Sequence, residues 1–230
     1  EYSCARSHVI SKVGYKALQN DIIDYLSEKV AAGSITKGAV YFRDLKAGPI
    51  FGIDETETFS PASLLKLPVA FAYFNLSEEQ PNLLEQKILY AKETLVQPRS
   101  YRLRELNTND LVEGQVYTVQ DLLRSSIMHS DNLAYYLLVE YLNTEVRGGA
   151  NSGSVVLQEL GVIDPRDEKE EVVTVRGYST LFRQLYNVSY LSPEHSEILL
   201  SWLAGSTYAK GLKAGVPEGI EVANKFGERE

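Results

Sequence analysis

Apolar and polar residues at the start of the chain follow first the period of a helix and then that of a β-hairpin. Apolar side chains recur three or four residues apart at Leu18, Ile22, Tyr25 and Leu26. This spacing predicts an amphipathic helix, and Gly33 suits its C-terminal end. Residues 40–43 alternate as a strand, residues 46–49 suit a turn, and residues 50–53 return as a second strand. A helix followed by a hairpin is typical of an α+β fold rather than of repeating βαβ units.

The central part of the chain, residues 63–203, is predicted to be mostly helical. An apolar run over residues 64–74 indicates a buried helix that begins near Ser63. Two later pairs are helix-start signals, namely Thr118 with Asp121 and Ser192 with Pro193. One face of a further helix is apolar and consists of Ala134, Leu137, Leu138, Tyr141 and Leu142.

The end of the chain, residues 220–227, is predicted to form a strand that returns to the first hairpin. The expected fold class is therefore α+β, with an antiparallel sheet built from both chain ends, flanking helices and an inserted all-helical lobe. We expect a single domain over residues 1–230. Its α/β lobe would comprise about 1–62 and 204–230, and its helical lobe about 63–203.

Composition limits the partners of the protein. The chain has 230 residues, 44% of them hydrophobic, and a net charge of −8. The negative net charge argues against nucleic acid or an anionic membrane surface as partner. Cys4 is the single cysteine, so no intrachain disulfide is possible, and histidine and cysteine do not cluster as metal ligands do. We expect neither a metal nor a cofactor. No apolar stretch is long enough to span a membrane, and no signal peptide is visible.

Three short motifs carry the candidate chemistry. They are Ser-Leu-Leu-Lys at 63–66, Ser-Asp-Asn at 130–132 and Lys-Phe-Gly at 225–227. Each could occur by chance, and the second could be only a polar helix cap. Their joint order makes coincidence a poor explanation, because together they supply a nucleophile, a proton shuttle and a cation for a carboxylated substrate.

Ser63 and Lys66 have the spacing of a nucleophile and its base on one helix face. A serine hydroxyl needs an adjacent base, and a lysine can serve only if burial or a second cation lowers its pKa. Lys225 could be that cation. A histidine-based triad is disfavoured, because His8, His129 and His195 accompany no Gly-x-Ser-x-Gly motif. We expect His8 and His195 to be exposed.

The chain resembles the class A β-lactamase and penicillin-binding protein superfamily of serine hydrolases. The three motifs carry this resemblance, and residues 88–96, 111–119 and 157–161 extend it, so that it covers about 18–227. It implies the β-lactamase/transpeptidase-like version of the α+β fold. It also implies that Ser63 is acylated, that Lys66 activates it, and that Ser130 passes a proton to the leaving nitrogen.

The resemblance also implies how a substrate is held. Asn132 would bind the substrate amide, Lys225 would hold the carboxylate, and Gly227 and Glu228 would also be substrate-binding residues. The backbone N–H groups of Ser63 and Glu228 would form the oxyanion hole. The implied activity is hydrolysis of β-lactam amides through an acyl-enzyme. The alternatives are a D,D-peptidase acting on peptidoglycan stem peptides and a slowly deacylating β-lactam sensor or binding module. The expected partner is thus a small β-lactam or a D-alanyl peptide.

The sequence departs from the family at two places. Class A enzymes activate the deacylating water with a glutamate in a Glu-x-x-Leu-Asn setting, which is absent, and residues 162–171 are acidic instead. Either Glu168, Glu170 or Glu171 reaches the site, or this segment is a solvated acidic loop, which its charge favours. Without that base an acyl-enzyme would persist. Phe226 stands where relatives have the hydroxyl of Thr or Ser.

Two further expectations follow from the resemblance. Family members continue after the third motif with strands and a helix, so we expect a C-terminal segment to be missing beyond Glu230. The family is exported, which implies the periplasm or the extracellular face of a bacterial membrane. A leader or membrane anchor would then have been removed from the N-terminus.

Overall fold

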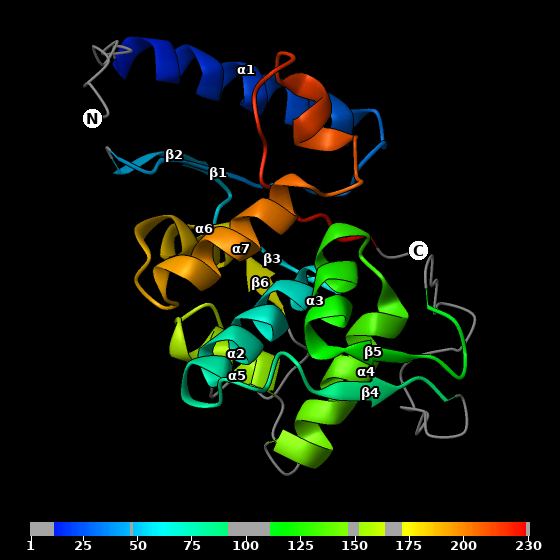
Figure 1. Ribbon diagram of the computed structural model, residues 1–230. Coiled ribbons are helices and arrows are strands. Elements are labelled where there is room, and N and C mark those ends of the chain that lie inside the picture. The colour runs from blue at the N-terminus through cyan, green and yellow to red at the C-terminus, as the bar shows by residue number, and fades with distance from the viewer. Residues whose placement is uncertain (1–11, 47, 92–110, 147–151, 164–171, 229–230) are drawn as a thin grey trace. The chain divides into compact units, whose positions relative to one another are not determined.

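The computed structural model describes residues 12–46, 48–91, 111–146, 152–163 and 172–228 (Figure 1). The chain divides into two compact units. The first comprises Glu1–Phe59 and Thr174–Ser179, and the second Ser60–Val173 and Thr180–Glu230. The lobe boundaries expected from the sequence stay a prediction.

The first unit contains a helix and a hairpin, as predicted. Its elements are α1 (Lys12–Ala31), β1 (Val40–Asp44), β2 (Gly48–Ile53) and β3 (Thr58–Phe59). Gly33, just past α1, has a φ of 67°, a conformation that favours glycine and ends the helix. β1 and β2 are antiparallel, with Phe42 opposite Phe51. The rings of Tyr15 and Phe42 lie 5.6 Å apart and those of Phe42 and Phe51 5.3 Å apart, so aromatic packing supports the hairpin.

The second unit is mostly helical, which confirms the prediction for the centre of the chain. Its elements are η1 (Ala62–Leu65), α2 (Lys66–Glu79), β4 (Lys87–Leu89), β5 (Val116–Thr118), α3 (Val119–Met128), α4 (Asn132–Tyr141), η4 (Leu142–Val146), α5 (Ser152–Glu159), α7 (Pro193–Ala204) and η5 (Gly211–Gly215). β4 pairs with β5 in antiparallel register. The boundary between the units falls at β6 (Val173–Thr174) and within α6 (Val175–Asn187), and β6 pairs with β3.

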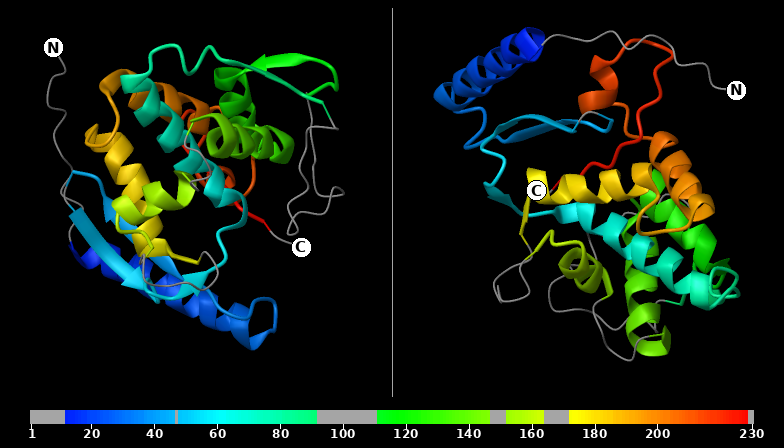
Figure 2. Two further views of the ribbon diagram at one scale, coloured as in Figure 1. Left: turned by 90° about the horizontal axis from the view of Figure 1, so that it is seen from below. Right: turned by 90° about the vertical axis from the view of Figure 1, so that its left-hand side faces the viewer.

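Helix α2 forms the core of the second unit. It is apolar on every side, which is typical of a helix buried all round, and Leu67, Phe71 and Phe74 are fully buried. It packs against α5 and α3, and α3 packs against α4 (green in Figures 1 and 2). The buried Tyr73 hydroxyl donates to the Leu138 carbonyl of α4 over 2.7 Å. These contacts fix α2, whose first residue is Lys66.

Local capping signals in the sequence are confirmed. Thr118 caps α3, and its side chain and that of Asp121 form a capping box. Ser192 caps α7, and Pro193 is the first residue of that helix. Each cap satisfies N–H groups that have no partner inside the helix, so both helices start where these residues stand.

The C-terminal segment differs from the sequence prediction. Residues 220–228 form neither helix nor strand, although a strand was expected at 220–227. A strand requires a ladder partner, whereas Asn224 donates its N–H to the Leu203 carbonyl near the end of α7. The α+β class itself is confirmed, with short two-stranded sheets.

Candidate active site

Ser63 and Lys66 meet at the junction of η1 and α2. Ser63 lies in the 3₁₀ turn and Lys66 begins the α-helix, so a separation of three residues brings their side chains together. The Lys66 ammonium donates to Ser63 Oγ over 2.7 Å. When Lys66 is neutral, its nitrogen can instead accept the Ser63 proton across the same contact. Ala62 precedes the serine with a φ of 47°, a strained conformation for a residue other than glycine.

The surroundings of Lys66 adjust it toward the role of a base. Its side chain is only 3% exposed, and burial lowers its pKa to about 8, although the carboxylate of Asp131 works in the opposite direction. Its ammonium also donates to Asn132 Oδ1 over 2.6 Å and lies 5.3 Å from the centre of the Tyr135 ring. Tyr135 was not singled out in the sequence, but it stands three residues after Asn132 on the same face of α4.

The Ser130–Asn132 turn caps a helix and also contacts both lysines. Asp131 is the N-cap of α4, and its buried carboxylate accepts the N–H of Ala134 over 2.9 Å. Asn132 then starts the helix and reaches Lys66. Ser130 has a φ of 56°, a left-handed conformation that costs a non-glycine residue about 1 kcal/mol. The helix cap therefore holds a strained serine beside the candidate site.

Lys225 joins the site from the C-terminal segment. Its ammonium donates to Ser130 Oγ over 2.8 Å and to the Phe226 carbonyl over 2.9 Å. Burial, and then the charge of Lys66, lower its pKa to about 7. The hydrogen bonds form two groups, Ser63–Lys66–Asn132 and Ser130–Lys225. The two groups are neighbours, because the 130–132 turn contributes to both and the charge of Lys66 acts on Lys225.

Gly227 allows the C-terminal segment to approach the first turn of the site. A Cβ atom on this residue would lie 2.7 Å from the Pro61 carbonyl oxygen and 3.2 Å from the Leu64 nitrogen, closer than side chains pack. Next to it, the Glu228 carboxylate accepts a hydrogen bond from the Tyr208 hydroxyl over 3.1 Å. The oxyanion hole expected at the backbone N–H groups of Ser63 and Glu228 stays a prediction.

Several predicted features lie outside the described residues. Glu168, Glu170 and Glu171, the candidate deacylation acids, belong to this group, as do Cys4 and His8. Among the residues that the structure does describe, no three His, Cys, Asp or Glu side chains gather as a metal site would require. None of the described helices is long and apolar enough to cross a membrane.

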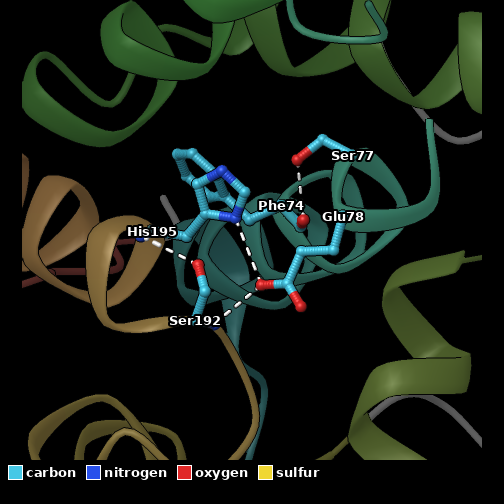
Figure 3. A network of polar contacts seen from close by, with 5 residues as sticks. All are labelled: Phe74, Ser77, Glu78, Ser192 and His195. Atoms are coloured by element: carbon cyan, nitrogen blue, oxygen red, sulfur yellow. Dashed lines mark hydrogen bonds and ion pairs between the residues drawn. The ribbon is translucent and has the colours of Figure 1, made fainter. Parts of the chain in front are cut away.

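His195 is not exposed as the sequence suggested. Its side chain is 17% exposed, and its Nδ1 lies 3.2 Å from Glu78 Oε1, which also accepts the Ser192 N–H over 2.7 Å (Figure 3). Its ring packs 5.0 Å from that of Phe74. Glu78 is twelve residues beyond Lys66 on α2, which is about 18 Å along a helix. His195 therefore fastens α7 to α2 and does not serve Ser63.

Comparison with known proteins identifies the family. The family model described as "Beta-lactamase enzyme family" matches residues 18–230. A β-lactamase from Bacillus licheniformis is 29% identical over 161 residues, which cover 63% of this chain and 48% of that protein. A β-lactamase from Citrobacter koseri is 28% identical over 184 residues, covering 74% of this chain and 59% of the relative. The chain thus spans about half the length of these curated relatives.

Solved structures agree on the fold. A mutant of PBP-A, described as an acyl-enzyme complex with penicillin G, superimposes with a TM-score of 0.70 at 22% identity, over 93% of this chain and 78% of that one. A β-lactamase from Chitinophaga pinensis gives a TM-score of 0.69 at 20% identity, over 91% and 79%. These likenesses confirm the β-lactamase/transpeptidase-like fold. With the family model matching nearly the whole chain and the motif side chains gathered around Ser63, the chain belongs to the β-lactamase enzyme family.

Proposed function

We propose that the protein is an active-site serine hydrolase that forms an acyl-enzyme on Ser63 and hydrolyses β-lactam amides. The observation that carries this proposal is the pair of hydrogen bonds that join Ser63 to Lys66 and Ser130 to Lys225. Each of the two hydroxyls thus contacts one lysine. The pKa of Lys66 is lowered to about 8 and that of Lys225 to about 7. Such lysines can exchange protons near neutral pH.

The acylation step uses these groups in turn. Neutral Lys66 accepts the Ser63 proton as Oγ bonds to the lactam carbonyl carbon. As the carbon–nitrogen bond breaks, Ser130 gives its proton to the leaving nitrogen, and Lys225 restores that proton through the 2.8 Å contact. Asn132 can hold the substrate amide, and Lys225 and Gly227 the carboxylate end. Backbone N–H groups, with those of Ser63 and Glu228 as candidates, stabilise the oxyanion.

Deacylation separates the leading proposal from its rival. The sequence lacks the Glu-x-x-Leu-Asn setting, and Phe226 has no hydroxyl for a substrate carboxylate. The missing glutamate setting favours, as the second candidate, a penicillin-binding D,D-peptidase or a slowly deacylating sensor, whereas Phe226 points to a substrate that differs from ordinary penicillins. The candidate acids Glu168 and Glu170 are the groups that would restore hydrolysis. Export to the periplasm or cell surface belongs to the same proposal, because β-lactams and peptidoglycan are met there.

The test is the mass of the intact protein over time after mixing with penicillin G, together with detection of the hydrolysed product. An adduct that appears and clears as product forms supports a β-lactamase. An adduct that persists supports the second candidate, and release of D-alanine from a stem peptide would identify the peptidase.

Ser63→Ala should abolish the adduct, and Lys66→Ala should slow it by orders of magnitude, because each removes one half of the activated nucleophile. Normal labelling of Ser63→Ala would overturn the assignment.

A further inference from the structure

The Phe226 ring contacts two side chains. It stacks on Tyr208, with ring centres 3.9 Å apart and planes inclined by 14°, which is a close and nearly parallel stack. The Lys225 ammonium lies 4.5 Å from the centre of the same ring, within the range of cation–π contacts. Phe226 thus contacts both Tyr208 and the lysine that contacts Ser130.

Tyr208 is itself held at two points. Its hydroxyl donates to Glu228, two residues after Phe226. The Tyr208 side chain therefore contacts the C-terminal segment at two residues, Phe226 through its ring and Glu228 through its hydroxyl. That hydrogen bond raises the pKa of the Tyr208 hydroxyl, which therefore stays a donor at neutral pH. The ring and the hydroxyl together restrict how this segment can shift.

The backbone beside Tyr208 is fastened to the turn that carries Ser130. Thr207 donates both its N–H, over 3.0 Å, and its hydroxyl, over 3.2 Å, to the carbonyl of Met128. Met128 ends α3 and stands two residues before Ser130. The carbonyl at the end of a helix lacks a partner inside the helix, so these donors satisfy it. Tyr208 therefore connects the Ser130 turn to the Lys225 segment.

We propose that Tyr208 is a positioning residue that, through Phe226, holds the Lys225 ammonium against the Ser130 hydroxyl. This inference rests on the proposed function, because it concerns the proton that Ser130 gives to the leaving nitrogen. Phe226 has no hydroxyl for a substrate carboxylate, and its ring orders the segment by stacking on Tyr208. Because the Phe226 ring contacts both Tyr208 and the Lys225 ammonium, loss of the stack lets the ammonium leave Ser130, and delivery of that proton slows.

Two acylating reagents separate this role from general loosening of the protein. With penicillin G, a Ser63–carbon bond forms, a carbon–nitrogen bond breaks, and the nitrogen needs a proton from Ser130. With an alkyl fluorophosphonate, a Ser63–phosphorus bond forms, the phosphorus–fluorine bond breaks, and fluoride leaves without a proton. In both reactions Lys66 takes the serine proton. The ratio of the two rates therefore reports on the Ser130–Lys225 relay.

The variants are Tyr208→Leu, Tyr208→Phe and Phe226→Leu in the full chain, with Tyr190→Leu as the matched control. Tyr190 also packs on a phenylalanine, Phe71, at 5.7 Å, and also donates its hydroxyl to a glutamate, over 2.6 Å. Tyr208→Leu and Phe226→Leu should each slow penicillin acylation ten-fold or more, on the order expected for a misplaced catalytic group. Fluorophosphonate labelling should change less than about two-fold.

The conservative variant Tyr208→Phe keeps the stack on Phe226 and loses only the hydrogen bond to Glu228, so its rate should stay much nearer that of the wild type than the rate of Tyr208→Leu. Tyr190→Leu should stay near the wild-type rate. Equal slowing with both reagents in the two Leu variants, or no slowing with either, overturns the positioning role and leaves the proposed function standing. A wild-type protein that reacts with the fluorophosphonate but never with penicillin G or a stem peptide contradicts the proposed function, and this inference with it.

Discussion

The rate of Ser63 acylation should pass through a maximum near pH 7.5, because the two site lysines must hold opposite protonation states. Lys66 must be neutral to accept the serine proton, and burial, partly offset by Asp131, brings its pKa to about 8. Lys225 must be charged to hold the substrate carboxylate and supply Ser130, and burial together with the charge of Lys66 brings its pKa to about 7.

The size of the effect follows from these two values. At about pH 7.5, roughly a quarter of the molecules have neutral Lys66 and roughly a quarter have charged Lys225, so about 6% hold both states. Two pH units to either side, one of the two fractions falls to about 0.3% while the other approaches unity. The rate should therefore drop roughly 20-fold on each side of the maximum.

The assay is the second-order rate constant of acylation by a fluorescent penicillin, measured by stopped flow across this pH range. Lys225→Arg should lower the rate overall, because a guanidinium cannot return a proton to Ser130. It should also remove the alkaline limb, because a guanidinium keeps its charge throughout, and leave the acidic limb of Lys66 in place. A rate that is flat across the range would refute the reasoning. So would an alkaline limb that survives in Lys225→Arg.

Three further predictions concern the scaffold of the site. Gly227→Ala places a Cβ atom 2.7 Å from the Pro61 carbonyl oxygen and should lower the acylation rate at least ten-fold. The control Gly215→Ala has open space around its Cβ and should leave the rate unchanged. Equal rates for the two variants would contradict the close approach of residue 227 to the turn that carries Ser63. Tyr73→Phe removes the buried hydrogen bond to the Leu138 carbonyl, which keeps the N–H of Leu142, and should lower the free energy of unfolding in urea by about 1 kcal/mol; an unchanged midpoint would argue against it. Burial alone would raise the pKa of the Glu78 carboxyl, but hydrogen bonds from Ser192 and His195 outweigh it and lower that pKa in the folded protein. The stability that this gives above the pKa of the unfolded chain is therefore lost as the pH falls through the pKa of the folded protein. Glu78→Gln should flatten this acid limb in thermal melts, and an acid limb as steep as that of the wild type would contradict it.

Interactions between residues close in sequence were predictable. The Thr118 capping box and the Ser192 cap each involve partners three residues apart, and the Ser63–Lys66 contact has the same separation. Such contacts are set by helix geometry alone, so the residue types at that spacing suffice to predict them.

Interactions between distant residues were not predictable in the same way. The pattern of residues 220–227 predicts a strand, but the backbone N–H of Asn224 in this segment instead donates to a carbonyl at the end of α7. His195 stands in a polar stretch, yet it is half-buried because Glu78, 117 residues away, lies opposite it. Tyr208 carried no local signal, since its importance depends on a ring eighteen positions later. In each case the deciding partner is chosen by tertiary packing.

The cap of α4 has a consequence for how this protein can evolve. Asp131 starts a core helix, while its two neighbours face the lysines, so a single turn serves both folding and chemistry. A change at Asp131 would weaken the helix start and release the strained Ser130 at once, and losses of the two kinds would compound. Adaptation to new substrates is therefore directed away from this turn and toward positions with a single task.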